Sequence, residues 1–128
     1  MKNFLDLLGR IFISVIFLYS GTNKILNYEI TFQWIEIFEI SKFLLVFTVI
    51  MEIIFPVFII IGYKTKIAAI ALSIYCLSTA FIFHNDFSSQ TQIITFLQNI
   101  SLTGALILMI VNGTKDWALE KKRKYVRL

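Results

Sequence analysis

Long apolar runs separated by short polar stretches dominate the pattern along this chain. Four runs occur, at residues 5–26, 43–61, 67–83 and 93–111. Each is close to the ~20 residues with which an α-helix, rising ~1.5 Å per residue, crosses a ~30 Å hydrocarbon layer. None alternates apolar and polar residues as the strands of a membrane barrel do. Because a helix pairs its backbone polar groups internally, the pattern predicts four membrane-spanning α-helices.

Composition supports the same architecture. Of the 128 residues, 58% are hydrophobic, compared with roughly 45–50% in soluble domains. A chain this short cannot bury so much apolar surface in its own core, so lipid must cover the remainder. We therefore expect an all-α, four-helix transmembrane bundle, a polytopic integral membrane protein in which residues 1–128 form a single domain. Membrane lipid is its first predicted partner; nucleic acid is not expected to be one, since no soluble domain is left over.

A shorter, weaker pattern lies between the first two runs, at residues 30–42. Phe32, Ile35 and Phe38 recur at helical spacing, with Glu36 and Glu39 between them. This spacing favours a short amphipathic helix lying on the outer membrane surface. The alternative is an irregular loop with aromatic anchors at the interface.

Charge predicts how the bundle is oriented. If four helices cross, most lysines and arginines fall on the side of the two termini, whereas the acidic residues of the 30–42 segment fall on the other side. The positive-inside bias then places both termini in the cytoplasm. We interpret the basic tail, residues 114–128, as an anchor for topology and anionic lipid. Asp6 and Arg10 interrupt the start of the first run and no A-x-A-like site follows it, which favours a membrane helix over a cleaved signal peptide.

One carboxylate lies inside the second run, where lipid should exclude it. Glu52 is ~15 Å from the cytoplasmic end of its predicted helix, close to mid-membrane. An ionisable group there costs ~2.5–3.5 kcal/mol on insertion scales, so it usually faces the bundle interior and has a partner. Pro56 adds polarity, because a proline leaves the carbonyl four residues earlier without its helical donor. We predict that Glu52 faces the interior and shares a polar cluster with the first and fourth spans.

Other polar side chains in the spans are candidates for the same site. With Glu52, the candidate pocket consists of Arg10, Lys24, Tyr75, His84, Asn99 and Thr103. Arg10 enters from the cytoplasmic side, and its long stem leads us to expect an ion pair with Glu52. We also expect Asn99 to approach His84 near the outer face, with Tyr75 deeper.

Each candidate has a structural alternative. Asp6 lies one turn before Arg10, so those two residues can form an interfacial ion pair instead. Asn99 can serve as a packing residue between helices, and His84 as a solvated helix cap. One histidine and the single Cys76 do not make a metal site, and none is predicted. Cys76 itself is expected to be a small buried apolar residue.

These residues lie in stretches that resemble the DoxX family of small four-helix membrane proteins. Arg10 and the SGTNK run look like that family's first-helix arginine and small-Gly-x-x-Lys ending, and Glu52 with the later Gly62 looks like its second helix. KIAAIAL is similar to the start of its third helix. The most specific stretch is FHNDF followed by QTQ and FLQNISLTGALIL, in which Gln98 replaces the usual lysine. NGTKDWALE departs from the usual ending. The resemblance covers nearly the whole chain and implies a bundle in the bacterial cytoplasmic (inner) membrane.

A shared fold does not transfer chemistry, so the resemblance leaves three functions open. Relatives implied by the resemblance include a quinone-reducing oxidoreductase subunit, so the first hypothesis is a redox-associated membrane subunit that binds a quinone or a similar lipophilic small molecule. No flavin, haem or iron–sulfur motif is evident, so a redox-protein partner would supply electrons. The second hypothesis is a non-enzymatic carrier or permeation protein, for which four short helices would need a homo-oligomer. The third is a membrane scaffold for soluble redox or stress enzymes.

Overall fold

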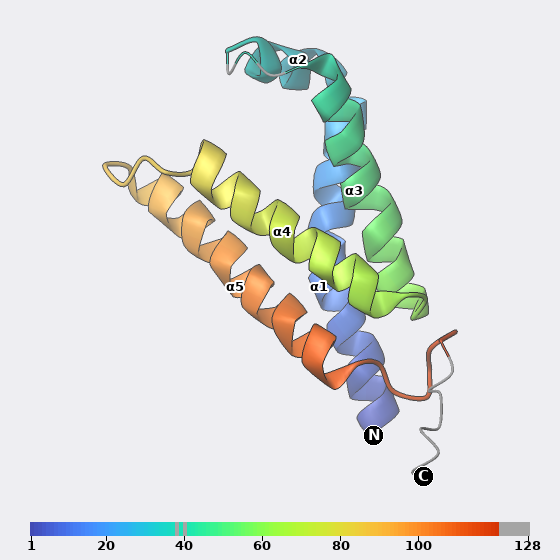
Figure 1. Cartoon of the computed structure of the whole chain (residues 1–128). Helices are drawn as coiled ribbons and strands as arrows, with labels where there is room; N and C mark the ends of the chain where they lie inside the picture. The colour runs from blue at the N-terminus through green and yellow to red at the C-terminus, as the bar shows by residue number, and fades with distance from the viewer. Residues whose placement is uncertain (38, 40, 121–128) are drawn as a thin grey trace.

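The chain forms a helical bundle in the computed structural model, which describes residues 1–37, 39 and 41–120. Four long helices and one short one follow in the order α1 (Lys2–Leu26), α2 (Tyr28–Ile37), α3 (Lys42–Ile61), α4 (Thr65–Phe83) and α5 (Gln90–Asn112) (Figure 1). The four long helices are each long and apolar enough to cross a membrane. The predicted all-α fold with four spans is confirmed.

The helices extend slightly beyond the predicted runs. α1 begins at Lys2 and α5 at Gln90, each three residues before the apolar run that it contains. Hydropathy marks the hydrocarbon-crossing part of a helix, whereas backbone hydrogen bonding continues into the polar interface. Local chemistry sets the ends of α3: the side chain of Ser41 accepts from the amide of Phe43, and Gly62 ends the helix in the left-handed conformation that glycine adopts without strain.

Residues 30–37 of the predicted amphipathic segment lie in the helix α2, which favours a surface helix over the irregular loop. The helix ends at Ile37 and does not continue to residue 42, because Ser41 caps α3 and Lys42 begins it. α2 lies across one end of the bundle, beyond the ends of α1 and α3 (Figure 1). Ile35 is its one buried residue, and the Lys42 ammonium lies 4.4 Å from the centre of the Phe32 ring. Phe38, the third residue of the predicted apolar face, lies outside the described residues.

The four long helices pack as two pairs. α1 packs mainly on α3 and α4 mainly on α5; α3 and α4 join the pairs, whereas α1 and α5 touch only slightly. The fully buried core contains Ile59, Ala68, Leu72, Cys76 and Leu106, so Cys76 is the buried apolar residue that was expected. From this core the two pairs diverge toward α2 (Figure 1). The bundle is therefore closed at one end and open at the other.

We call the closed end, where α1 begins and α5 ends, the tail end. Arg10 is 1% exposed there, and its guanidinium donates to the carbonyls of Ile60, at 2.8 Å, and of Trp117. Arg10 Nε lies 3.1 Å from Asp6 Oδ2 in an ion pair, and the amide of Lys115 donates to the same carboxylate oxygen. One arginine thus joins α1, the end of α3 and the segment after α5.

The segment after α5 is also held by its own backbone. The amide of Leu119 donates to the carbonyl of Ile61 at 3.0 Å, and the amide of Glu120 donates to the carbonyl of Gly62 at 2.8 Å. The predicted basic tail is therefore docked on the α3–α4 turn as far as Glu120, and its residues 121–128 lie outside the described part of the chain.

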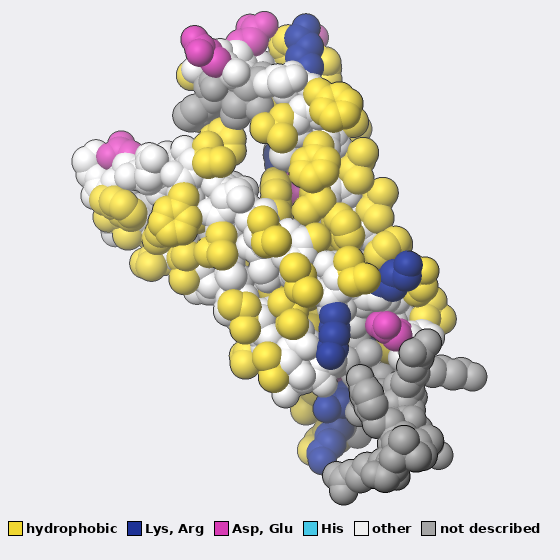
Figure 2. Space-filling view, in the orientation of Figure 1, with side chains coloured by type: hydrophobic (Ala, Val, Ile, Leu, Met, Phe, Trp, Pro, Cys, Tyr) yellow, Lys and Arg dark blue, Asp and Glu magenta, His cyan; other side chains and the backbone are white. Residues whose placement is uncertain are grey.

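Apolar side chains cover the outside of the helices, and acidic side chains gather over α2 (Figure 2). Exposed residues include Phe12, Ile74 and Leu108, at 69%, 62% and 64%. A soluble protein would not leave so many large apolar side chains in contact with water. This surface fits a surrounding of lipid, and its charge asymmetry is the basis of the predicted cytoplasmic orientation of both termini.

Candidate functional site

A cavity of about 530 Å³ lies where the two helix pairs diverge, below α2. All five helices contribute to its wall, and the molecule is visibly hollowed there (Figure 2). Nine of the twenty lining residues are aliphatic or aromatic, and the other eleven carry polar or charged side chains, several of them at the floor and along one rim. A cavity that combines apolar walls with convergent polar groups is the usual form of a small-molecule site.

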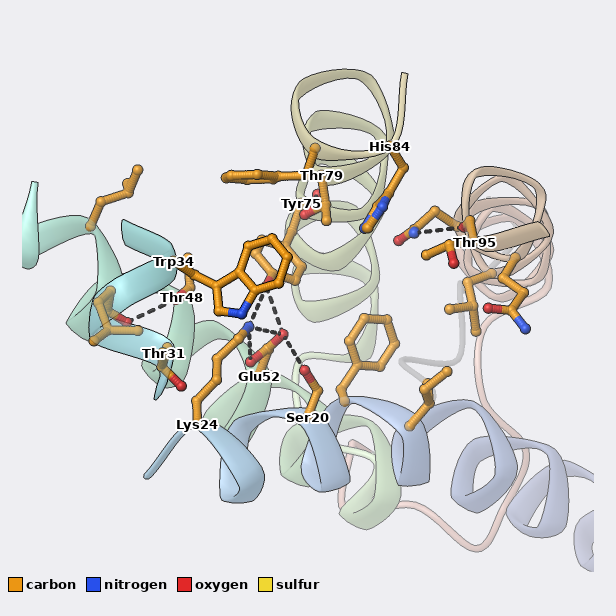
Figure 3. Close-up of a pocket in the computed structure, with 18 of the residues that line it drawn as sticks. Ser20, Lys24, Thr31, Trp34, Thr48, Glu52, Tyr75, Thr79, His84 and Thr95 are labelled. Carbon is orange, nitrogen blue, oxygen red and sulfur yellow. Dashed lines mark hydrogen bonds and ion pairs between the residues drawn. The ribbon is translucent and has the colours of Figure 1, made fainter. Parts of the chain in front are cut away.

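Glu52 is at the centre of the polar floor. Lys24 Nζ lies 2.7 Å from both oxygens of the Glu52 carboxylate. The Tyr75 hydroxyl donates to Glu52 Oε1 at 2.6 Å, and the Ser20 hydroxyl donates to the same oxygen at 3.0 Å. Lys24 also donates to the Tyr75 oxygen at 3.2 Å. Three helices thus meet in one connected network (Figure 3), which we call the Glu52 cluster: Ser20, Lys24, Glu52 and Tyr75.

The fold explains why these side chains meet. Ser20 and Lys24 are four residues apart on α1, so they project from the same face toward α3. Gly21 lets the two helices approach closely, because a Cβ atom there would lie 2.8 Å from Ile53 Cδ1 and 3.0 Å from Glu52 Cβ. The Glu52 side chain is 4% exposed and the Lys24 side chain is 26% exposed. The carboxylate is therefore the buried partner, and the ammonium faces the cavity.

The rim of the cavity carries a second polar group, contributed by α4 and α5. His84 Nδ1 lies 2.8 Å from Gln92 Oε1, and the amide of the Asn99 side chain donates to the carbonyl of Thr95 at 3.0 Å. Trp34 of α2 lines the cavity on the opposite side, over the Glu52 cluster (Figure 3). In the loop beyond the rim, hydrogen bonds from the side chain and the amide of Ser88 hold the pKa of the Asp86 carboxyl below its usual value.

The structure places most of the predicted site residues around this cavity. Glu52 faces the interior as expected, and the cavity is lined by the candidates Lys24, Tyr75, His84 and Asn99. His84 and Asn99 share the rim, but each is bonded to a different neighbour. Thr103 is buried outside the lining, where its hydroxyl donates to the carbonyl of Asn99 at 2.8 Å.

The expected ion pair between Arg10 and Glu52 is wrong. Glu52 pairs with Lys24, and Arg10 pairs with Asp6 at the tail end, which is the alternative that the i, i+4 spacing offered. The reason is that backbone carbonyls at the end of α3 and after α5 surround the guanidinium and keep it there. The predicted contribution of the fourth span is also wrong: within the described residues, α5 supplies no hydrogen bond to Glu52. The third span, α4, supplies Tyr75 instead.

Sequence reasoning did not select Ser20, Trp34 or Gln92 as site residues. The position of Ser20 one turn before Lys24 was a usable pattern, because both had to face the same neighbour. Trp34 could not be assigned, since an interfacial tryptophan is usually only an anchor. Among the described residues, no three His, Cys, Asp or Glu side chains gather closely enough to hold a metal ion.

Comparison with known proteins agrees with this architecture. The sequence profile of the DoxX family matches residues 5–85. The chain belongs to the DoxX family. It is similar to two Escherichia coli (strain K12) proteins. It is 26% identical to Inner membrane protein YqjF over 115 residues, covering 90% of this chain and 88% of that protein. It is 27% identical to Inner membrane protein YphA over 123 residues, covering 91% and 88%.

The predicted inner-membrane location of this DoxX protein is confirmed by these relatives together with the four apolar helices. No solved structure shows significant similarity to the chain.

Proposed function

We propose that this DoxX-family protein is a redox-associated membrane subunit that binds a quinone or a similar lipophilic small molecule in the cavity below α2. The observation that supports the proposal is the Glu52 cluster, a connected set of proton-bearing side chains at the floor of a cavity whose walls include apolar residues of all five helices. A packing role alone does not require an ammonium that faces a cavity.

The donors of the cluster match what a quinone head group needs. A quinone has two carbonyl oxygens that accept hydrogen bonds and no strong donors of its own. Lys24 Nζ uses its three N–H bonds within the cluster, two toward Glu52 and one toward the Tyr75 oxygen, and it is the more exposed member of the ion pair. Its bond to Tyr75 is the longest of the three, at 3.2 Å, so in this proposal Lys24 redirects that N–H to a bound carbonyl while Glu52 keeps the other two.

The same cluster can hold protons for the reaction. Reducing a quinone to a quinol takes two electrons and two protons. Lys24, Glu52 and Tyr75 are linked by bonds of 2.6 to 3.2 Å, within the range in which a proton can pass from donor to acceptor. In this proposal a redox-protein partner supplies the electrons, and this chain binds and orients the head group and holds its protons.

Trp34 provides a direct test of binding. The chain has two tryptophans, and Trp117 lies in the tail, where its backbone carbonyl rather than its side chain bonds Arg10. The Trp117→Phe variant therefore leaves one reporter in the cavity wall. Because quinones quench indole fluorescence on contact, decyl-benzoquinone should quench Trp34 with saturation in detergent or nanodiscs.

The control is the Trp34→Phe variant, whose remaining Trp117 should show only the weak, linear quenching caused by quinone dissolved in the membrane. Lys24→Met in the Trp117→Phe background should weaken the saturable part by about tenfold, since it removes a charged hydrogen-bond donor. Linear quenching of Trp34, equal to that of Trp117, would overturn the proposal.

The carrier hypothesis is separated from this one by flux. Proteoliposomes that show saturable quinone binding but no uptake of polar solutes support a binding subunit. Solute uptake that Glu52→Gln abolishes, without any quinone binding, supports the carrier. The scaffold hypothesis predicts neither result, and instead predicts loss of captured redox enzymes when residues 121–128 are deleted.

A further inference from the structure

A shallow apolar groove continues from the cavity along the seam between α1 and α5. It has a volume of about 480 Å³ and is lined by Ile16 of α1 and by one face of α5, namely Ile94, Leu97, Gln98, Ser101, Leu102 and Ala105. No charged side chain is among these residues. The groove exists because α1 and α5 touch only slightly, which leaves this seam of the bundle open.

The groove and the cavity are continuous. Ile16, Gln98 and Leu102 line both of them. On α5 the groove runs from Ile94 to Ala105, a length of ~16 Å at 1.5 Å per residue. It lies beside the cavity, which α5 lines from Gln92 to Leu102, and extends about one turn further toward the tail end. A molecule whose head group lies at the Glu52 cluster therefore has an apolar path out of the cavity that never crosses a charged surface.

Small side chains leave the lower part of the groove unfilled. Ser101 and Ala105 stand one turn apart on its floor, and the larger residues beside them are turned outward: Leu97 is 55% exposed and Ile94 is 49% exposed. Gln98 stands at the junction with the cavity, and its side chain has no hydrogen-bond partner among the described residues. The junction is thus open to an amphiphile whose polar and apolar parts meet at that level.

We infer that this groove is the site of the hydrocarbon chain of the ligand, and that the ligand is therefore a long-chain amphiphile that enters the cavity sideways from the lipid through the α1–α5 seam. The inference rests on the proposed function, which supplies the head-group site. Its independent support is the continuity of groove and cavity and the absence of charge along the groove lining.

The groove affects ligand binding through its shape rather than through the hydrophobic effect. Lipid tails are as apolar as leucine, so moving a hydrocarbon chain from the bilayer into the groove gains little by desolvation. What the groove supplies is room: a chain attached to a bound head group must lie somewhere, and filling the groove with protein atoms forces an overlap. The inference thus predicts a steric effect specific to ligands that carry a chain.

The experiment compares two quinones with the same head group, one with a decyl chain and one without a chain, using quenching of Trp34 in the Trp117→Phe background. The groove is filled by the double substitution Ser101→Phe and Ala105→Phe, at two residues that do not line the cavity. The matched control is Ile107→Phe on α5, at a half-exposed position that lines neither space. Each variant is compared with the parent for one ligand at a time, so the different membrane partitioning of the two ligands cancels.

Filling the groove should weaken binding of the decyl quinone by about tenfold, while binding of the chainless quinone should stay within about twofold of the parent. The control variant should bind both ligands like the parent. Because the chainless ligand reports an intact cavity, a misfolded variant cannot imitate this result.

Equal effects on both ligands, or no effect on either, would overturn the inference while leaving the proposed function in place. Failure of both ligands to quench Trp34 in the parent would instead reject the proposed function. A disulfide-linked dimer formed by a Ser101→Cys variant in membranes would show that a second copy of the chain covers the groove, and would also overturn the inference.

Discussion

Lys24 binds both oxygens of a carboxylate that is almost completely buried, and it does so from the wall of a cavity. Such a pair is seldom the most stable solution, because removing two charges from water costs about as much as their attraction returns. An apolar pair of similar volume would pack the same space at no such cost. The Lys24–Glu52 pair is therefore better explained by a role in binding a ligand in the cavity than by a contribution to the stability of the fold.

A double-mutant cycle tests this explanation. Lys24→Met alone should lower stability by about 1–3 kcal/mol, since it leaves the Glu52 carboxylate buried with only neutral donors. Adding Glu52→Leu should recover most of the loss, because no buried charge then remains. Thermal unfolding in detergent micelles measures both. If the double variant is less stable than Lys24→Met, the ion pair is a stabilising element and the explanation is wrong.

Arg10 should behave differently, because its partners lie in three directions: the Asp6 carboxylate, the carbonyl of Ile60 and the carbonyl of Trp117. Arg10→Lys keeps the charge but cannot reach Asp6, Ile60 and Trp117 together, since an ammonium on a flexible stem lacks the planar fork of a guanidinium. We expect a loss of about 1–3 kcal/mol in the same unfolding assay. Combining Arg10→Gln with Glu52→Gln should give the sum of the two single losses, because the residues belong to separate networks. Mutual rescue would show that they are coupled.

At the scale of the elements, the α3–α4 turn and the segment after α5 depend on one glycine. Gly62 has a φ of +73°, and a Cβ atom there would lie 2.6 Å from Ala118 Cα and 2.9 Å from Arg10 Nη1. Gly62→Ala should therefore cost about 1–2 kcal/mol in backbone strain and also displace the docked segment. Limited trypsin digestion at Lys115 should become faster.

Gly113 offers the matched control for this substitution. It also has a positive φ, of +64°, but its ψ of −170° lies in a region that is essentially restricted to glycine, and no atom lies within 4 Å of its added Cβ. Gly113→Ala should therefore show backbone strain at least as large as that of Gly62→Ala in thermal unfolding, but without the steric contact with Ala118 that undocks the segment. Equal cleavage rates in the two variants would mean that Gly62 acts only through its backbone conformation.

At the scale of the whole molecule, the orientation in the membrane is the first matter to establish. The α4–α5 loop and the chain after α5 lie at opposite ends of the bundle (Figure 1). Ser89→Cys should react with an impermeant thiol reagent added outside the cell, and Leu128→Cys should react only after the membrane is opened. Cys76 is fully buried and should give little background. Labelling of both from outside would overturn the predicted topology.

Much of this fold was predictable because a bilayer makes hydropathy decisive: a run of about twenty apolar residues has few alternatives to a spanning helix. The divergence of the two helix pairs was not predictable. Near the tail end, the fully buried Ala68 and Ala69 let α4 approach its neighbours closely. Which small residues face which helix cannot be seen in a single sequence.

The site was partly predictable for a related reason. Glu52 stood out because a lone carboxylate at mid-membrane requires a partner. The partner was misassigned because Arg10 and Lys24 both have the reach, and the choice depends on carbonyls of Ile60 and Trp117 that carry no pattern in the sequence. A side chain that bonds to backbone is invisible to residue-type reasoning, since every residue has the same carbonyl.

The contacts of Arg10 also have a consequence in time. During synthesis Asp6 and Arg10 emerge first, the Ile60 carbonyl follows 50 residues after Arg10, and the Trp117 carbonyl follows 107 residues after it. A nascent chain with three inserted helices therefore holds an arginine whose acceptors have not all been made. The tail end can be completed only after the ribosome has passed the last span. An interrupted or truncated chain would consequently present an incompletely bonded arginine at the membrane, a state that quality-control proteases could distinguish from the finished protein.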